Sequence, residues 1–214
     1  MINMQDKTQL IKTELANALS HGVGILFALV ASPILTVMAF QKHNGVLTFA
    51  VIFYCFSMLT TFTFSTLYHA FFEPTAKATL RIFDHISIFF LIGGTTVPFV
   101  VQFTDSPTAL GFLVAQWSLI AVGIIMKVFF TGKYRLFSSL VYIGLGSMVL
   151  LLGKDFLMAM PSGSTIFVGI GGLCYLIGVI FYQNERISYN HFIWHLFVLA
   201  AAIAHYVAVF ISLK

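Results

Sequence analysis

Two histidines stand four residues apart near the C-terminus of the sequence, in the segment His191-Phe-Ile-Trp-His195. On a helix, side chains at positions i and i+4 lie on one face, so both imidazoles would face one point, a common geometry for holding a transition metal. The zinc-protease motif has a glutamate directly after its first histidine, whereas Phe192 and Ile193 stand at this point. The pair therefore indicates a metal site and gives no support to a protease.

Two further polar groups lie at the edges of apolar stretches. Ser65 and His69 are i, i+4 neighbours at the end of one stretch, and Asp84-His85 follows Arg81 at the start of another. A single histidine at the membrane interface, such as His69, is commonly no more than a hydrated side chain at the end of a helix. A carboxylate facing lipid is too costly to persist, so Asp84 must face the interior of a helix bundle. An ion pair with Arg81, three residues earlier, is the alternative interpretation of Asp84.

A third polar group, Glu14, Asn17, Ser20 and His21, leads into the first apolar stretch. Glu14, Asn17 and His21 follow an i, i+3, i+7 pattern and share one helix face. The alternative is a solvated first turn with Ser20 as its cap. His205 lies about 15 Å deeper than the second histidine of the C-terminal pair, and we expect it to be packed or hydrogen-bonded in the core.

The elements that position these groups are membrane-spanning helices. The chain is 59% hydrophobic and 8% charged, with a mean hydropathy of +0.98, whereas soluble domains carry roughly 25% charged residues. Because a helix needs about 20 apolar residues to cross a bilayer, we predict seven spans, near 20–40, 46–71, 80–102, 108–130, 135–153, 163–182 and 190–213. The prediction is an all-α, multi-pass membrane protein that forms one domain, 1–214, with a short cytoplasmic segment, 1–19.

The basic residues predict the orientation of the bundle. With the N-terminus in the cytoplasm, eight of the eleven Lys and Arg residues fall on the cytoplasmic side. By the positive-inside rule, the N-terminus is expected inside and the C-terminus outside. The opposite side holds only Lys42, Lys154 and Lys214. The net charge of +4 is explained by this bias and requires no nucleic acid.

Topology then brings the polar groups to one depth. The second span runs inward and ends at His69, while the third and seventh spans run outward and begin with Asp84 and with His191 and His195. All of them lie within roughly two helical turns of the cytoplasmic face. Three histidines, Ser65 and Asp84 at one depth fit a catalytic zinc site, in which three protein ligands leave the fourth position open.

Five motifs carry a resemblance to a known family: E-x2-N-x2-SHG (14–22), S-T-L-Y-H (65–69), F-D-H-x-x-I-F (83–89), G-T-x-x-P-F (94–99) and H-x-I-W-H (191–195). Together they resemble the bacterial haemolysin III family, which is related to the progestin and adipoQ receptors and more distantly to alkaline ceramidases. The resemblance implies that zinc is bound by His69, His191 and His195, and that Ser65 and Asp84 are catalytic. Residues expected to hold the ligands in place are Glu14, Asn17, Ser20, His21 and His85.

These observations lead to a hypothesis and its alternatives. We expect a zinc-dependent hydrolase that acts on an acyl amide or ester of membrane lipids, in the bacterial inner membrane. The alternative is a non-catalytic, receptor-like regulator in which zinc is structural and its fourth position is filled by Asp84 or His21. A pore-forming haemolysin is disfavoured because the spans are apolar nearly all round, with no long amphipathic stripe. Membrane lipids are the expected partners, and the sequence identifies no protein partner.

Overall fold

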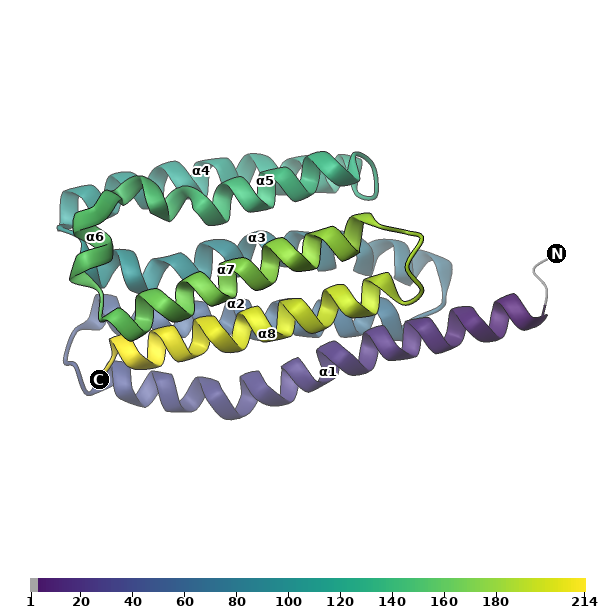
Figure 1. Cartoon of the computed structure of the whole chain (residues 1–214), viewed down its shortest axis with the longest axis horizontal. Helices are drawn as coiled ribbons and strands as arrows, with labels where there is room; N and C mark the ends of the chain where they lie inside the picture. Colours follow the sequence, from purple (N-terminus) through teal and green to yellow (C-terminus); the bar gives the residue numbers. More distant parts are fainter. Residues whose placement is uncertain (1–3) are drawn as a thin grey trace.

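The bundle is entirely helical in the part of the chain that the computed structural model describes, residues 4–214, with side chains from residue 7 (Figure 1). Seven helical spans within that range are long and apolar enough to cross a membrane. The all-α, seven-span fold predicted from hydropathy is therefore confirmed. The helices are α1 (Met4–Phe40), α2 (Gly45–Ala70), α3 (Pro74–Phe103), α4 (Ser106–Phe130), α5 (Arg135–Ser147), η1 (Met148–Leu152), α6 (Gly153–Ala159), α7 (Ser162–Gln183) and α8 (Asn190–Ser212).

Side-chain caps fix where three of the helices begin. The Asn44 side chain accepts a hydrogen bond from the Leu47 amide at 3.1 Å, and Asp105 caps α4 in the same way. Glu73 caps α3 by accepting from backbone amides, and Pro74 follows at the first helical position, where its missing N–H is not needed. The Ala76 amide is foremost among the donors that hold the pKa of Glu73 below its usual range.

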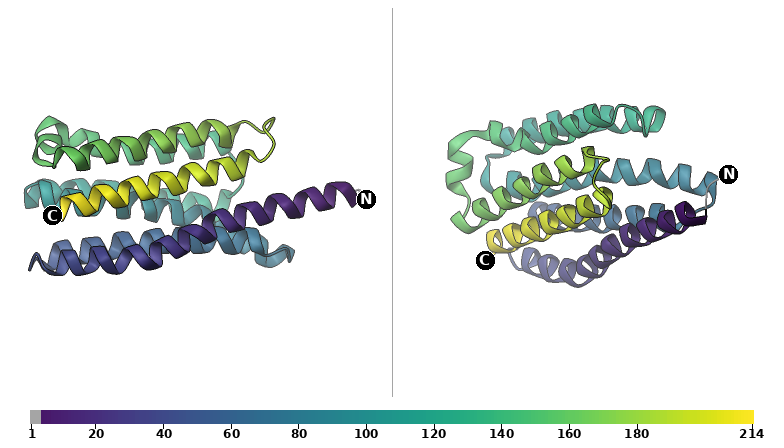
Figure 2. Two further views of the ribbon diagram at one scale, coloured as in Figure 1. Left: turned by 60° about the horizontal axis from the view of Figure 1, so that its bottom comes forward. Right: turned by 45° about the vertical axis from the view of Figure 1, so that its right-hand side comes forward.

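The first helix begins much earlier than the hydropathy pattern indicates. The first span was predicted near 20–40, after a short cytoplasmic segment, whereas α1 starts at Met4 and extends past the other helices (Figures 1 and 2). Leu15 and Leu19 recur at helical spacing in this stretch and are 56% and 62% exposed, which provides an apolar face toward lipid. Ser20 is therefore in the interior of a helix, and the interpretation of Ser20 as an N-terminal cap is wrong.

The fifth span is interrupted rather than continuous. A single helix over 135–153 followed by a loop was expected, but α5 ends at Ser147, and the 3₁₀ stretch η1 and the short helix α6 complete the span. Gly153, at the junction, has φ +80°, a conformation that glycine adopts without steric cost. The helix α6 turns the chain from α5 toward α7 at the end of the bundle opposite the N-terminus (Figure 2).

The two halves of the bundle differ in packing. Helices α1, α2 and α3 pack in sequence, and α7 packs along α8, whereas α5 makes only sparse contacts with α3, α4 and α7. Glycines permit the close approaches: a Cβ at Gly94 would lie 2.5 Å from the Ser57 hydroxyl, and one at Gly178 would lie 2.7 Å from the Trp194 ring. Tight packing therefore surrounds α2, and looser packing leaves a space beside α5.

Candidate metal centre

Three histidines from two helices converge at the end of the bundle where α2 ends and α8 begins (Figure 1). His69 is in the last turn of α2, and His191 and His195 occupy the first turns of α8. Ligand nitrogens of the three side chains all lie within 4.8 Å of one another. One metal ion could contact all three. The structure thus brings together the residues that topology and spacing predicted to meet.

The ring of His69 is held by a carboxylate on the neighbouring helix α1. Its Nδ1 atom lies 2.7 Å from Oε2 of Glu14, and the Lys77 ammonium lies 3.1 Å from the same oxygen. The other ring nitrogen, Nε2, is buried and has no hydrogen-bond partner among the described residues. When Nδ1 donates its proton to Glu14, Nε2 carries a free lone pair, which is the usual arrangement for a metal-binding histidine backed by a carboxylate.

A similar arrangement orients His195, which is 2% exposed. Its Nδ1 atom lies 3.2 Å from the carbonyl oxygen of Asn17 and 3.1 Å from the hydroxyl of Ser20. Donation from Nδ1 to the carbonyl leaves Nε2 of His195 free as a ligand atom. The Nε2 atom of His191 is also buried and unpaired within the described part of the chain. A buried polar atom without a partner is costly, so this donor set fits a metal ion.

His21 belongs to the same cluster in space but not to the group of candidate ligands. It is 3% exposed, and its ring stacks on His195 with centroids 3.7 Å apart and planes at 10°. The ring of Phe62 packs against His21 edge-on, with centroids 5.2 Å apart. His21 therefore packs behind His195 and fixes its position. Glu14 and Asn17 contact His69 from the same face of α1 that carries His21, as the spacing of these three residues predicted.

Ser65 and Asp84 line a cavity of about 1030 Å³ that also contains His191 and His195 in its wall. Oδ2 of Asp84 lies 3.6 Å from Nδ1 of His85, which in turn lies 2.7 Å from the Arg81 carbonyl oxygen. Among described side chains Asp84 pairs with His85 and not with Arg81, so the alternative ion pair is not formed. His85, predicted among the residues that hold the ligands in place, contacts Asp84 and the Arg81 carbonyl oxygen.

Within the described part of the chain, the candidate metal group consists of three ligands. No further His, Cys, Asp or Glu side chain of residues 7–214 joins the three histidines, and neither Asp84 nor His21 fills the remaining position. The arrangement therefore resembles an open metal site more than a closed structural one.

The rest of the cavity is largely apolar. It extends from His191 at the start of α8 to Phe156 and Met160 at the opposite end of the bundle. His205 also lines it, with Nε2 3.3 Å from the Val168 carbonyl oxygen, as expected for a hydrogen-bonded core histidine. One polar end and a long apolar remainder are suited to an elongated amphipathic molecule.

Sequence reasoning missed the role of Lys77, which it treated only as a charge that orients the bundle. Lys77 contacts Glu14, and its ammonium also donates to the Tyr68 carbonyl at 3.0 Å. Lys77 and Glu14 are far apart in the sequence, so no local residue spacing predicts their contact. Only the folded structure shows it.

Comparison with known proteins places the chain in a family. The profile of the family described as "Haemolysin-III related" matches residues 9–206. "Hemolysin-3" of Bacillus cereus is 35% identical over 93% of this chain and 91% of the relative. "Hemolysin-3 homolog" of Bacillus subtilis (strain 168) is 33% identical over 93% of each chain.

A more distant relative comes from animals. The human "Monocyte to macrophage differentiation factor" is 27% identical over 91% of this chain and 82% of the relative. No solved structure matches the chain. The family match covers all five motifs that carry the resemblance and the three candidate ligands. The chain belongs to the haemolysin-III-related family of integral membrane proteins.

Proposed function

We propose that this protein is a zinc-dependent hydrolase of the bacterial inner membrane that cleaves an acyl amide or ester of membrane lipids. The observation that carries the proposal is the three-histidine group, which no fourth ligand joins among the described side chains. Two of its members, His191 and His195, line the same cavity as Ser65 and Asp84. His69, His191 and His195 would hold the ion through the nitrogens that protein groups leave free. Imidazole suits zinc well, which supports zinc as the metal.

When bound, zinc supplies a Lewis acid that polarises a carbonyl and lowers the pKa of water toward about 7. Asp84 is suited to general acid–base catalysis, because its carboxylate faces the cavity and His85 positions it at 3.6 Å. It would accept a proton from the water that attacks the acyl carbon and return it to the leaving amine or alcohol. Ser65 would donate a hydrogen bond to the substrate, whose acyl chain would lie along the apolar length of the cavity.

The test combines metal content with turnover for the purified full chain in mixed micelles. We expect one zinc per chain in the wild type and in Asp84→Asn, and none in a folded His191→Ala. Fatty-acid release from acyl amides and esters should fall by roughly 10²–10⁴-fold in Asp84→Asn. The exposed His43 provides the control, since His43→Ala should change neither measurement. A zinc-loaded wild type that releases no fatty acid from any acyl lipid contradicts the hydrolase proposal.

A non-catalytic regulator with structural zinc is the second candidate, and one feature favours it. The candidate ligands and their partners come from α1, α2 and α8, so a bound ion would join these helices. A structural site has no free position, whereas a catalytic site binds an added hydroxamate or thiol at the metal. Binding of such a ligand to the zinc-loaded protein supports the hydrolase, and failure to bind supports the regulator.

A further inference from the structure

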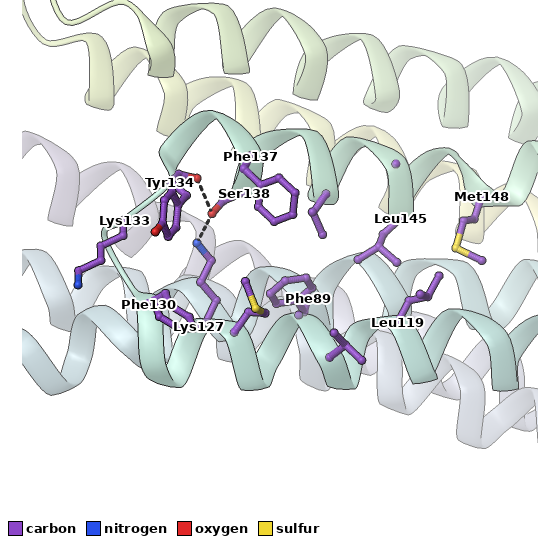
Figure 3. A pocket seen from close by; sticks show the side chains of 15 residues that line it. Phe89, Leu119, Lys127, Phe130, Lys133, Tyr134, Phe137, Ser138, Leu145 and Met148 are labelled. Atoms are coloured by element: carbon purple, nitrogen blue, oxygen red, sulfur yellow. Dashed lines mark hydrogen bonds between the residues drawn. The ribbon is translucent and has the colours of Figure 1, made fainter.

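An apolar groove of about 410 Å³ runs between α4 and α5 (Figure 3). Phe89, Leu119, Leu145 and Met148 line its length. A Cβ added at Gly144, in its wall, would meet no atom within 4 Å, so the groove has unfilled space at this point. Since most side chains of α4 and α5 face outward, the groove opens toward the acyl chains of the bilayer.

A buried lysine stands at one end of this groove. The Lys127 side chain is 6% exposed, and its ammonium donates to the Ser138 hydroxyl at 2.6 Å (Figure 3). The Tyr142 ring lies 5.6 Å from the ammonium. No carboxylate of residues 7–214 lies within ion-pair distance of Lys127. An ammonium has three donor hydrogens, and a buried charge without a counterion is unfavourable, so Lys127 lacks the anion that its position requires.

Two more cations lie at the same end. Lys133 lines the groove, and the Arg81 guanidinium packs so closely on Gly132, which has φ +81°, that no side chain would fit there. The nearby acids are engaged elsewhere: Asp84 lies beside His85, and Glu185 pairs with Arg135. Neither Arg81 nor Lys133 forms an ion pair within the described chain. This end of the groove therefore carries a net positive charge.

We propose that Lys127, flanked by Arg81 and Lys133, binds the phosphate of an anionic phospholipid whose acyl chain lies in the α4–α5 groove. Phosphate accepts several charge-assisted hydrogen bonds at once, which suits converging Lys and Arg side chains. The lipid-facing groove selects a phosphate that carries an acyl chain, and the uncompensated charge selects a lipid with a net negative headgroup. Lys127, Arg81 and Lys133 also line the cavity that contains Asp84 and His191. The proposed phosphate site nevertheless requires no metal ion, because it consists of these three cations and of the groove between α4 and α5.

The test measures lipid binding to the delipidated full chain in a neutral detergent, by native mass spectrometry and thermal shift. We expect phosphatidylglycerol to bind about tenfold more tightly than phosphatidylcholine, a difference of about 1.4 kcal/mol. Both lipids carry the phosphate, but the quaternary ammonium of phosphatidylcholine neutralises its headgroup and is repelled by the three cations. Lys127→Gln should remove this preference, and Lys127→Arg should retain it. Lys154→Gln, an exposed lysine at the opposite end of the bundle, should leave it unchanged.

A second variant tests the groove without altering charge. Gly144→Phe fills the groove and should weaken phosphatidylglycerol binding, whereas Gly111→Phe, on an exposed part of α4 with nothing within 4 Å, should not. If Lys127→Gln does not fold, Lys133→Gln and Gly144→Phe are used in its place. Unchanged phosphatidylglycerol binding in both of these variants overturns the proposal. Equal affinity for the two lipids overturns it too. Displacement of the lipid by millimolar inorganic phosphate would show a free-anion site instead.

Discussion

Replacement of Glu14 by glutamine should weaken zinc binding without removing any ligand. The Glu14 side chain is 13% exposed and its Oε2 atom lies 2.7 Å from Nδ1 of His69. Glutamine keeps the length of the side chain and an acceptor oxygen but loses the charge. A hydrogen bond to a charged group contributes about 1.5–3 kcal/mol and a neutral one about 0.5–1.5 kcal/mol. The difference of about 1–1.5 kcal/mol corresponds to roughly tenfold weaker binding, the lower end of the usual range for partners of metal ligands.

The assay is competition for zinc between the purified protein and a chromogenic chelator, with folding checked by circular dichroism. Glu73→Gln is the matched control, because Glu73 is an exposed carboxylate at the same end of the bundle that caps α3 and makes no contact with the histidines. We expect Glu73→Gln to bind zinc with wild-type affinity. If Glu14→Gln also binds with wild-type affinity, the carboxylate does not act through His69, and the reasoning is refuted.

Substitutions of glycine test the packing around the cavity. Gly171→Ala should lower the free energy of unfolding by about 1–3 kcal/mol, because its Cβ would overlap the half-buried ring of His205. The neighbouring Gly172→Ala has nothing within 4 Å and should be neutral or slightly stabilising; equal melting temperatures for the two variants would contradict the assigned contact. Gly146→Phe, which places a ring in the cavity, should abolish lipid hydrolysis while zinc content stays at one per chain. Gly111→Phe adds the same ring on an exposed part of α4 and should retain turnover, so loss of activity in both variants would exclude blockage of the cavity as the cause.

The fold and the histidine group could both be predicted from the sequence, because both depend on strong local sequence patterns. Apolar stretches of about 20 residues define the spans, and reversal of direction at each loop puts the end of one span beside the start of the next. Since His69 ends α2 and His191 begins α8, topology alone predicts that they share a depth. The spacing of Glu14, Asn17 and His21 likewise predicts one face of α1 turned toward them.

Other features could not be predicted from the sequence, because they depend on contacts between residues that are far apart along the chain. The 3₁₀ stretch in the fifth span consists only of apolar residues, Met148–Leu152, so hydropathy does not distinguish it from the α-helix that precedes it. The start of α1 at Met4 was missed because polar residues in the first turns hid its apolar face. Lys77 and Lys127 were interpreted as orienting charges, since their partners Glu14 and Ser138 are brought to them by packing between helices. These two lysines differ from other lysines at the membrane interface in their three-dimensional contacts and not in residue type.

Stability measurements alone do not separate a catalytic metal from a structural one in this bundle. His69 is on α2 and His191 and His195 are on α8, while these two helices are joined chiefly through α1, which packs on both. A metal ion would add a direct link between α2 and α8, so its removal should loosen the bundle under either hypothesis. The hypotheses differ at the side of the histidine group that faces the cavity. A hydrolase requires this side to accept an added ligand, and the cavity wall that contains Ser65 and Asp84 beside His191 provides the space for one.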